Sequence, residues 1–159
     1  MGSNYGTPPV RGREHERLGA FVGTWHAEGQ SFATNKDPGH PRGAAEPWVS
    51  NEVTEWHPGQ FFVVQHEDAT AGAAPLITHA VIGYDATGGD YIAHAFENHG
   101  HYRRYVVRVV GRTWTFTGDT ERARVEFSED GNTQTVCWEW RPEGDAWLPL
   151  CDRTNVRSR

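Results

Sequence analysis

Short segments of alternating apolar and polar residues, separated by turns rich in glycine, proline, asparagine and aspartate, fill most of this sequence. They recur at the spacing of about 8–12 residues that is typical of antiparallel barrels and sandwiches. No segment is long enough to supply the helix of a parallel crossover, so a parallel sheet is not expected. We expect ten strands, at Thr24–Ala33, Trp48–His57, Gln60–Asp68, Leu76–Tyr84, Tyr91–Glu97, Tyr102–Val110, Thr113–Thr117, Arg122–Phe127, Thr135–Arg141 and Trp147–Val156.

A short helix is expected before the first strand. In residues 13–22 the side chains of Leu18, Phe21 and Val22 form one apolar stripe, and Gly23 ends the helix. Trp25 is the first large side chain of the strand that follows, and the same face continues with small side chains. The predicted fold class is therefore all-β: one antiparallel up-and-down barrel of about ten strands, with a short N-terminal helix closing one end.

Composition limits the classes of partner. The chain has 159 residues, which suits one barrel domain at residues 13–159 behind a flexible lead-in at residues 1–12. Its net charge of −6 argues against nucleic acid as a partner, because a phosphate backbone calls for a basic surface. No apolar run approaches the roughly 18 residues of a membrane helix, and the N-terminus has no features of a signal peptide. We therefore expect a cytoplasmic protein with no membrane partner, and the sequence leaves a homodimer open.

Gly23-Thr24-Trp25 stands behind the short helix and is followed only by antiparallel strands. This beginning resembles that of the calycin superfamily: lipocalins, fatty-acid-binding proteins and nitrobindins. Other strings are similar to a family of uncharacterised bacterial calycin-like proteins, and the similarity spans residues 15–156. These strings are Val81-Ile-Gly-Tyr-Asp85, Arg112-Thr-Trp-Thr-Phe116, and Trp147 with Asp152-Arg-Thr.

The resemblance implies a hollow barrel in which, as in lipocalins, a late-strand arginine packs across the tryptophan. Arg153 and Arg157 are the candidates for that arginine. The resemblance does not extend to the haem site of nitrobindins. Those proteins carry Gly-x-Trp-x-Gly-x-Gly, whereas Ala27 replaces the second glycine here, and no histidine follows His101 to ligate haem.

The hairpin around Asn98-His-Gly100 carries the main candidates for chemistry. On its second strand, Arg104 and Arg108 are regularly spaced and suit solvent, so Tyr105 is expected inside, with Arg103 and His101 at the mouth. Tyr105 and Arg103 would then reach an enclosed apolar space.

On the first strand of that hairpin we expect Ile92, His94 and Phe96 to face the lumen and Glu97 to face outward. If Glu97 faced inward instead, burial would raise its pKa toward neutrality and make it the natural acid or base. The predicted catalytic residues are His94, Tyr105, Arg103 and Glu97.

Aromatic residues and further histidines on apolar strands are expected to line the lumen. Three inward histidines would suffice for a zinc or iron site, but no compact ligand motif is present. We therefore predict no metal ligands and no cofactor, with haem or a divalent metal as an alternative. The predicted ligand-binding residues are Trp25, Phe62, His66, His79, Phe96, His101, Trp114, Trp138 and Trp140.

Two cysteines lie on the last predicted hairpin. A turn centred on Gly144 pairs residues that lie equally far before and after residue 144. Cys137 then lies opposite Cys151, on the face of the hairpin that does not carry Trp138. A cross-strand disulfide is then conceivable, but we expect two free thiols in a cytoplasmic protein.

The sequence supports three functional hypotheses. The first is binding of a small, mainly apolar or amphipathic molecule in the lumen, which suits the small-residue face after Trp25. The second is a cofactor-independent cyclase, isomerase or lyase that uses lumen side chains for acid–base catalysis. The third is haem or metal binding through lumen histidines.

Overall fold

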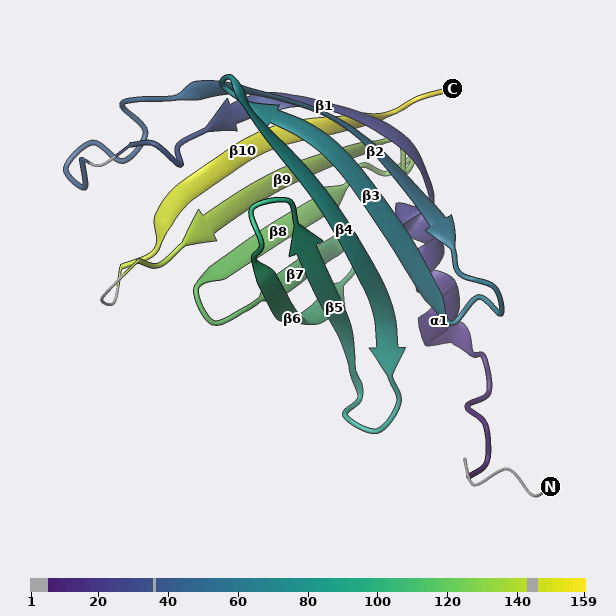
Figure 1. The fold of residues 1–159 in the computed structure, drawn as a ribbon. Helices are drawn as coiled ribbons and strands as arrows, with labels where there is room; N and C mark the ends of the chain where they lie inside the picture. Colours follow the sequence, from purple (N-terminus) through teal and green to yellow (C-terminus); the bar gives the residue numbers. More distant parts are fainter. Residues whose placement is uncertain (1–5, 36, 143–145) are drawn as a thin grey trace.

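The computed structural model describes residues 6–35, 37–142 and 146–159. A short α-helix and a 3₁₀-helix precede ten strands (Figure 1). Their bounds are α1 Arg13–Arg17, η1 Leu18–Phe21, β1 Gly23–Ser31, β2 Glu46–Trp56, β3 Phe62–Ala71, β4 Ala74–Asp85, β5 Asp90–Glu97, β6 Tyr102–Val110, β7 Thr113–Thr117, β8 Glu121–Phe127, β9 Thr133–Trp140 and β10 Leu148–Arg157.

Each strand pairs antiparallel with the strand before it, and β1 pairs with β10 to close the barrel. The closing ladder runs from Trp25 opposite Arg157 to Ser31 opposite Cys151. Closure leaves no free sheet edge, which removes the usual site of strand-to-strand aggregation. The predicted fold class is confirmed, including the short helical segment near the N-terminus.

Buried side chains fill the helical end of the barrel. Leu18 and Trp25 are fully buried, and Phe21 meets the rings of Trp114 and Phe127 edge to face, with centroids 4.9 and 5.2 Å away. The Trp25 indole Nε1 donates a hydrogen bond to the carbonyl oxygen of Phe21 (2.9 Å). This bond fixes η1 to the first strand and makes the aromatic cluster a plug.

Arg157 lies across the outer side of this plug. Its guanidinium carbon is 4.2 Å from the centroid of the Trp25 ring, and its nitrogens donate to the carbonyl oxygens of Val22, Ala20 and Gly131. Of the two arginines that the resemblance offered for this contact, Arg157 makes it. Arg153 stacks instead on Trp48, 4.7 Å from the ring centroid.

A β-bulge in β10 decides which of its side chains face inward. Pro149 pairs with Glu139, but Cys151 pairs with Trp138, so Leu150 is an extra residue in the ladder. An extra residue reverses the inside–outside alternation from that point on. As a result Cys151 and Arg153 enter the barrel, whereas Asp152 pairs with Cys137 on the outside.

The predicted pairing of the two cysteines is therefore wrong. The register expected from a turn at Gly144 holds as far as Pro149 and is then shifted by one residue. Cys137 is exposed and Cys151 is buried, and both are free thiols. Burial raises the pKa of the Cys151 thiol to about 11, so this sulfur is a neutral group in the wall of the barrel.

Candidate ligand-binding site

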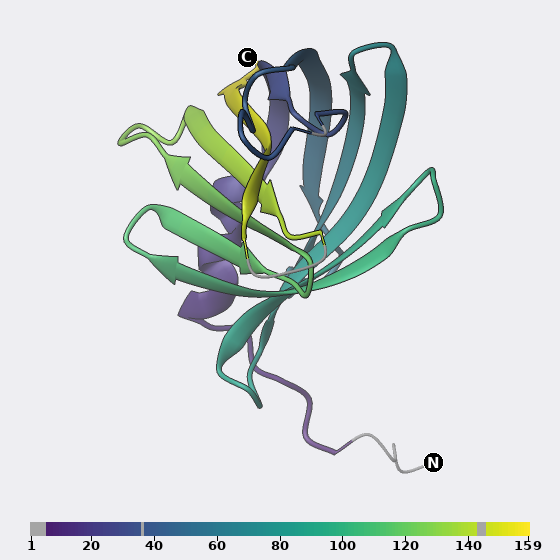
Figure 2. The same cartoon turned by 90° about the vertical axis from the view of Figure 1, so that its left-hand side faces the viewer.

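The barrel is hollow at the end opposite the helices, which faces the viewer in Figure 2. A cavity of about 340 Å³ extends from this end down to Ile82 and Phe116. Small side chains on neighbouring strands, Ala80, Ala93 and Ala95, leave the space that larger residues fill in the plug. A cavity of this size falls within the range of about 300–1,000 Å³ that is usual for small-molecule sites.

The inward face of β5 is the opposite of the one expected. Tyr91, Ala93, Ala95 and Glu97 point into the barrel, because Ala93 pairs with the inward Tyr105 and directly opposed residues share a face. The prediction placed Ile92, His94 and Phe96 inside because their side chains are the larger ones, whereas a hollow barrel needs small residues on its inner wall.

Five predicted site residues lie on the outer surface, so their predicted facing is wrong. His94 Nδ1 lies 2.8 Å from the hydroxyl of Tyr102, and His66 Nδ1 lies 2.7 Å from His79 Nε2. Phe62 and Phe96 are 39% and 53% exposed. His66, His79 and His94 thus do not enter the lumen, and they cannot supply the three inward histidines of the haem and metal hypothesis. In the described part of the chain, no three His, Cys, Asp or Glu side chains are grouped to hold a metal ion.

Other predicted residues do line the cavity. Arg103, Tyr105, His101 and Trp138 lie where they were expected, and Glu97 joins them. The other three tryptophans are placed elsewhere. Trp25 and Trp114 belong to the plug, and Trp140 lines a separate hollow of about 260 Å³ beside the β1–β2 connection.

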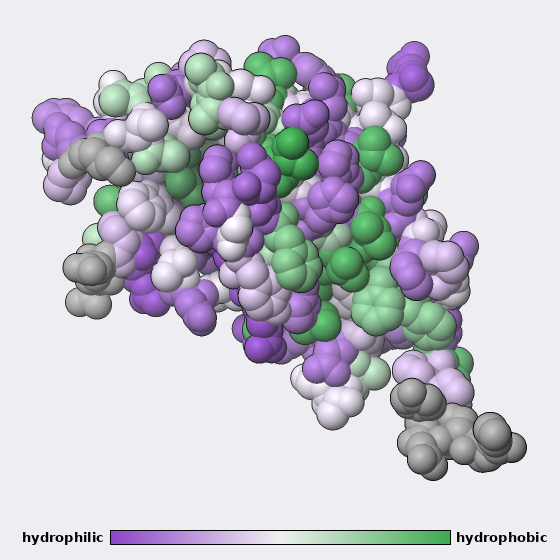
Figure 3. Space-filling view, viewed as in Figure 1, coloured by the Kyte–Doolittle hydropathy of each residue, from purple (hydrophilic) through white to green (hydrophobic). Residues whose placement is uncertain are grey.

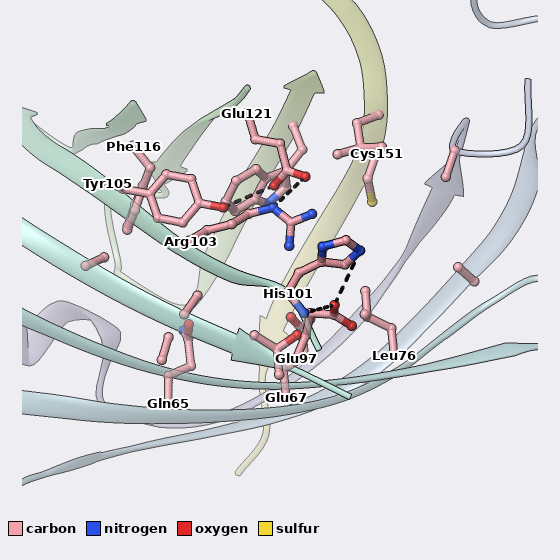
Figure 4. Close-up of a pocket in the computed structure, with 18 of the residues that line it drawn as sticks. Gln65, Glu67, Leu76, Glu97, His101, Arg103, Tyr105, Phe116, Glu121 and Cys151 are labelled. Carbon is pink, nitrogen blue, oxygen red and sulfur yellow. Dashed lines mark hydrogen bonds and ion pairs between the residues drawn. The ribbon is translucent and has the colours of Figure 1, made fainter. Parts of the chain in front are cut away.

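Glu97 is held at the mouth by the turn that follows it. Its carboxylate oxygens accept hydrogen bonds from the backbone N–H groups of His101 (2.9 Å, Figure 4) and His99 (2.7 Å). The ring nitrogen His99 Nδ1 lies 2.7 Å from the same carboxylate. Burial alone would raise the pKa of Glu97, but these hydrogen bonds outweigh it and lower the pKa below its usual value. Glu97 is therefore an ionised carboxylate, not the near-neutral acid expected for an inward position.

A second charged pair lies on the wall formed by β6 and β8. Arg103 Nε lies 3.0 Å from one carboxylate oxygen of Glu121, and the Tyr105 hydroxyl donates to the other (3.1 Å), as Figure 4 shows. Burial, reinforced by the negative charge of Glu121, raises the pKa of Tyr105. The phenol is thus a permanent hydrogen-bond donor at ordinary pH.

The deepest charges were not predicted as a site. Arg153 forms a two-bond ion pair with Glu67 (3.0 and 3.4 Å), and the side chains are only 8% and 11% exposed. Ser50 Oγ donates to the same carboxylate (2.8 Å). Among the described residues, the Nε of Arg153 has no hydrogen-bond partner, although it is buried. A buried donor without a partner is costly, so this nitrogen adds to the free-energy cost of placing the ion pair inside the barrel.

Glu52 lies directly across the ladder from Glu67 and is 4% exposed. Burial, and then the negative charge of Glu67, raises the pKa of Glu52 to about 7, although Arg153 opposes the shift. Thr54 Oγ1 donates to Glu52 (3.1 Å). This buried cluster thus holds two carboxyl groups, Glu52 and Glu67, and one arginine, Arg153, and the proton on Glu52 balances the charge.

This arrangement predicts a pH-dependent stability. Between about pH 4.5 and 7 the folded protein keeps the Glu52 proton that the unfolded chain has lost. The free energy of unfolding should therefore fall as pH rises through this window, by about 1.4 kcal/mol per unit from this group. Glu52→Gln should remove that component. Urea unfolding at pH 5, 6, 7 and 8 would show the variant gaining stability relative to wild type.

The exposed Glu129→Gln substitution is the matched control and should follow the wild-type pH profile. A Glu52→Gln profile parallel to wild type would show that Glu52 is ionised throughout.

Two solved structures have a similar fold over nearly the full chain. The crystal structure of Rv2717c from M. tuberculosis is 13% identical, with a TM-score of 0.66, and the match covers 94% of this chain and 100% of that one. What the two chains share is the fold, which here is a closed antiparallel barrel of ten strands.

The second structure is the S-type phycobiliprotein lyase CPES from Guillardia theta, at 11% identity and a TM-score of 0.55. This match covers 96% of this chain and 99% of the lyase. No protein-family model and no curated protein sequence matches the chain. At these identities the likeness concerns the fold alone. No helix in the described residues is long and apolar enough to cross a membrane.

Proposed function

We propose that the cavity at the open end binds a small, mainly apolar molecule. The observation that carries this proposal is a hollow of about 340 Å³ in an otherwise packed barrel, walled by Leu76, Ile82, Phe116 and Trp138. Excluding water from such walls would drive binding of an apolar body. Both arginines that line the cavity are paired with carboxylates, Arg103 with Glu121 and Arg153 with Glu67, so a bound molecule need not carry a negative charge.

The polar groups indicate one further property of the ligand. Arg103 lines the cavity, and it pairs with Glu121 through Nε, whereas its two terminal guanidinium nitrogens project away from that pair (Figure 4). The ligand is therefore expected to carry a hydrogen-bond acceptor, such as a carbonyl or ether oxygen, within reach of Arg103.

Filling the cavity tests the proposal. Ala95→Trp would place an indole in the hollow, and we expect it to weaken binding of the polarity-sensitive dye 1-anilinonaphthalene-8-sulfonate at least tenfold in a fluorescence titration. Thr115→Trp adds the same side chain on the outer face of β7 and should bind as wild type does. Equal dye affinity in a folded Ala95→Trp protein would place the dye elsewhere and contradict the proposal.

Acid–base catalysis on the bound molecule is the second candidate. It is favoured by one observation: Glu97, Arg103 and Tyr105 line the same cavity, so a carboxylate, a cation and a phenol surround one space. One structural neighbour is named as a lyase, which is consistent with this alternative. His94 cannot take part from the outer face.

Mass spectrometry of a small molecule co-purified with the protein would separate the two candidates. Chemical conversion by wild type, lost in Tyr105→Phe while binding is retained, supports an enzyme. Recovery of the unchanged molecule supports a binding protein.

A further inference from the structure

Two histidines meet on the outer surface of the barrel. His66 on β3 and His79 on β4 are directly opposed in the antiparallel ladder, and both residues are exposed. The ring nitrogens His66 Nδ1 and His79 Nε2 lie 2.7 Å apart, and the ring centroids are 4.4 Å apart. Figure 3 shows this side of the molecule, where polar side chains lie among apolar ones over β3 to β5.

The partner of each ring is what distinguishes this pair. Four other histidines, His26, His40, His99 and His101, have a carboxylate oxygen within 4.0 Å of a ring nitrogen. An ionised carboxylate only accepts hydrogen bonds, so an imidazole nitrogen bonded to one carries a proton. Between two imidazoles, one of the facing nitrogens must lack a proton in order to accept the bond. A lone pair therefore points to the place where the two rings meet.

The separation of these two nitrogens is close to that of two ligands on one metal ion. Imidazole nitrogens bind zinc at about 2.0–2.1 Å, so two of them at an angle of about 90–110° at the ion are about 2.8–3.4 Å apart. Small rotations of the two rings would widen the observed 2.7 Å to this range. The proton of the hydrogen bond can move to the other nitrogen of the same ring, because a neutral imidazole has two tautomers.

The backbone fixes the two rings before any ion binds. The β3–β4 ladder runs from Phe62 opposite Gly83 to Ala71 opposite Ala74, and the histidine pair lies near its middle. Directly opposed side chains in such a ladder have Cβ atoms about 4.5–5.5 Å apart. Ligands that are ordered in advance lose less conformational entropy on binding.

We propose that His66 and His79 form a binding site for a divalent transition-metal ion, with Nδ1 of the first and Nε2 of the second as ligands. Imidazole suits zinc, nickel and copper, and copper binds tightest in the general order of affinities. No third His, Cys, Asp or Glu joins the pair within residues 6–35, 37–142 and 146–159, so water or a ligand from another molecule completes the coordination. Exposed Asp68 follows His66 by two residues on the same face of β3 and adds a negative charge nearby.

Calorimetric titration of the untagged protein with Ni²⁺ tests the site. Wild type should bind one ion, and His66→Ala and His79→Ala should each weaken that binding at least tenfold, because one imidazole alone cannot chelate. His94→Ala is the matched control. It removes another outward histidine, on the neighbouring strand β5, and should bind Ni²⁺ as wild type does.

Thermal unfolding gives a second measurement. Saturating Ni²⁺ should raise the unfolding temperature of wild type, because the two ligands are brought together only in the folded ladder. The same addition should leave the unfolding temperature of His66→Ala unchanged. Both histidines are exposed, so each alanine variant should keep the wild-type circular dichroism spectrum.

Three results would overturn the proposal. The first is no binding by wild type at 1 mM Ni²⁺. The second is equal affinity in wild type and in the His66→Ala, His79→Ala double variant, which would assign the binding to another group, such as the exposed thiol of Cys137. The third is loss of binding in only one of the single variants. The site lies outside the lumen, so none of these results bears on ligand binding there.

Discussion

Replacing Arg153 with methionine is expected to destabilise the protein by about 3–5 kcal/mol, measured as the free energy of unfolding in urea at pH 7. Glu67 would keep its hydrogen bond from Ser50 but lose its only ion-pair partner among the described residues, in a position where its side chain is 11% exposed. Removing one member of a buried ion pair leaves an uncompensated charge, and this costs far more than the pair itself contributes.

The double variant Glu67→Gln with Arg153→Met should recover most of that loss, because it removes both charges together. An exposed pair provides the comparison. Arg124 lies beside Glu126 on the surface, with side chains 56% and 43% exposed, and Arg124→Met should cost less than about 1 kcal/mol. A similarly small cost for Arg153→Met would mean that water reaches Glu67 in solution.

Replacing Trp25 with alanine is the second change for which we expect a large effect, again about 3–5 kcal/mol. The side chain is fully buried, donates to the carbonyl oxygen of Phe21 and carries the Arg157 guanidinium on its face. Truncation would leave a cavity in the plug and release η1 from β1. Thermal unfolding followed by circular dichroism would measure the loss.

Trp25→Phe should lose less stability than Trp25→Ala, because it keeps a ring in the plug and removes mainly the indole hydrogen bond. Its affinity for a lumen ligand should be unchanged, since Trp25 does not line the cavity. Reduced dye binding in a stably folded Trp25→Phe protein would show that the plug and the cavity are coupled.

The strand order could be predicted from the sequence because alternation and turn residues are local signals. The facing of β5 could have been predicted too. The turn at Asn98-His-Gly100 is centred on residue 99, so residues equally far before and after it should pair. This rule, which also gave the expected pairing of the cysteines, places Ala93 opposite Tyr105, as observed. The prediction instead assigned the face of β5 with the larger side chains to the interior. This was wrong because the inner wall of a hollow barrel carries small residues.

The buried charges could not be predicted in this way. Trp48, Ser50, Glu52 and Thr54 alternate with Val49, Asn51, Val53 and Glu55, and neither set is clearly the apolar one. The polar set faces inward because Arg153 is there to compensate it, and Arg153 faces inward only because of the bulge at Leu150. A bulge follows from the fit of whole strands around the closed barrel, so the local sequence does not specify it.

The extra residue in β10 also affects how this chain can be compared with its relatives. A relative with one residue fewer between Pro149 and Cys151 would still form a strand there. If it is aligned without a gap, each residue after that point is matched to a residue of this chain on the opposite face of the sheet. An alignment without a gap there would equate Arg153 with a surface position and Asp152 with a lumen position. Transfer of binding residues between such proteins should therefore follow the Trp25–Arg157 pairing, which fixes the end of the strand, and count backward from it.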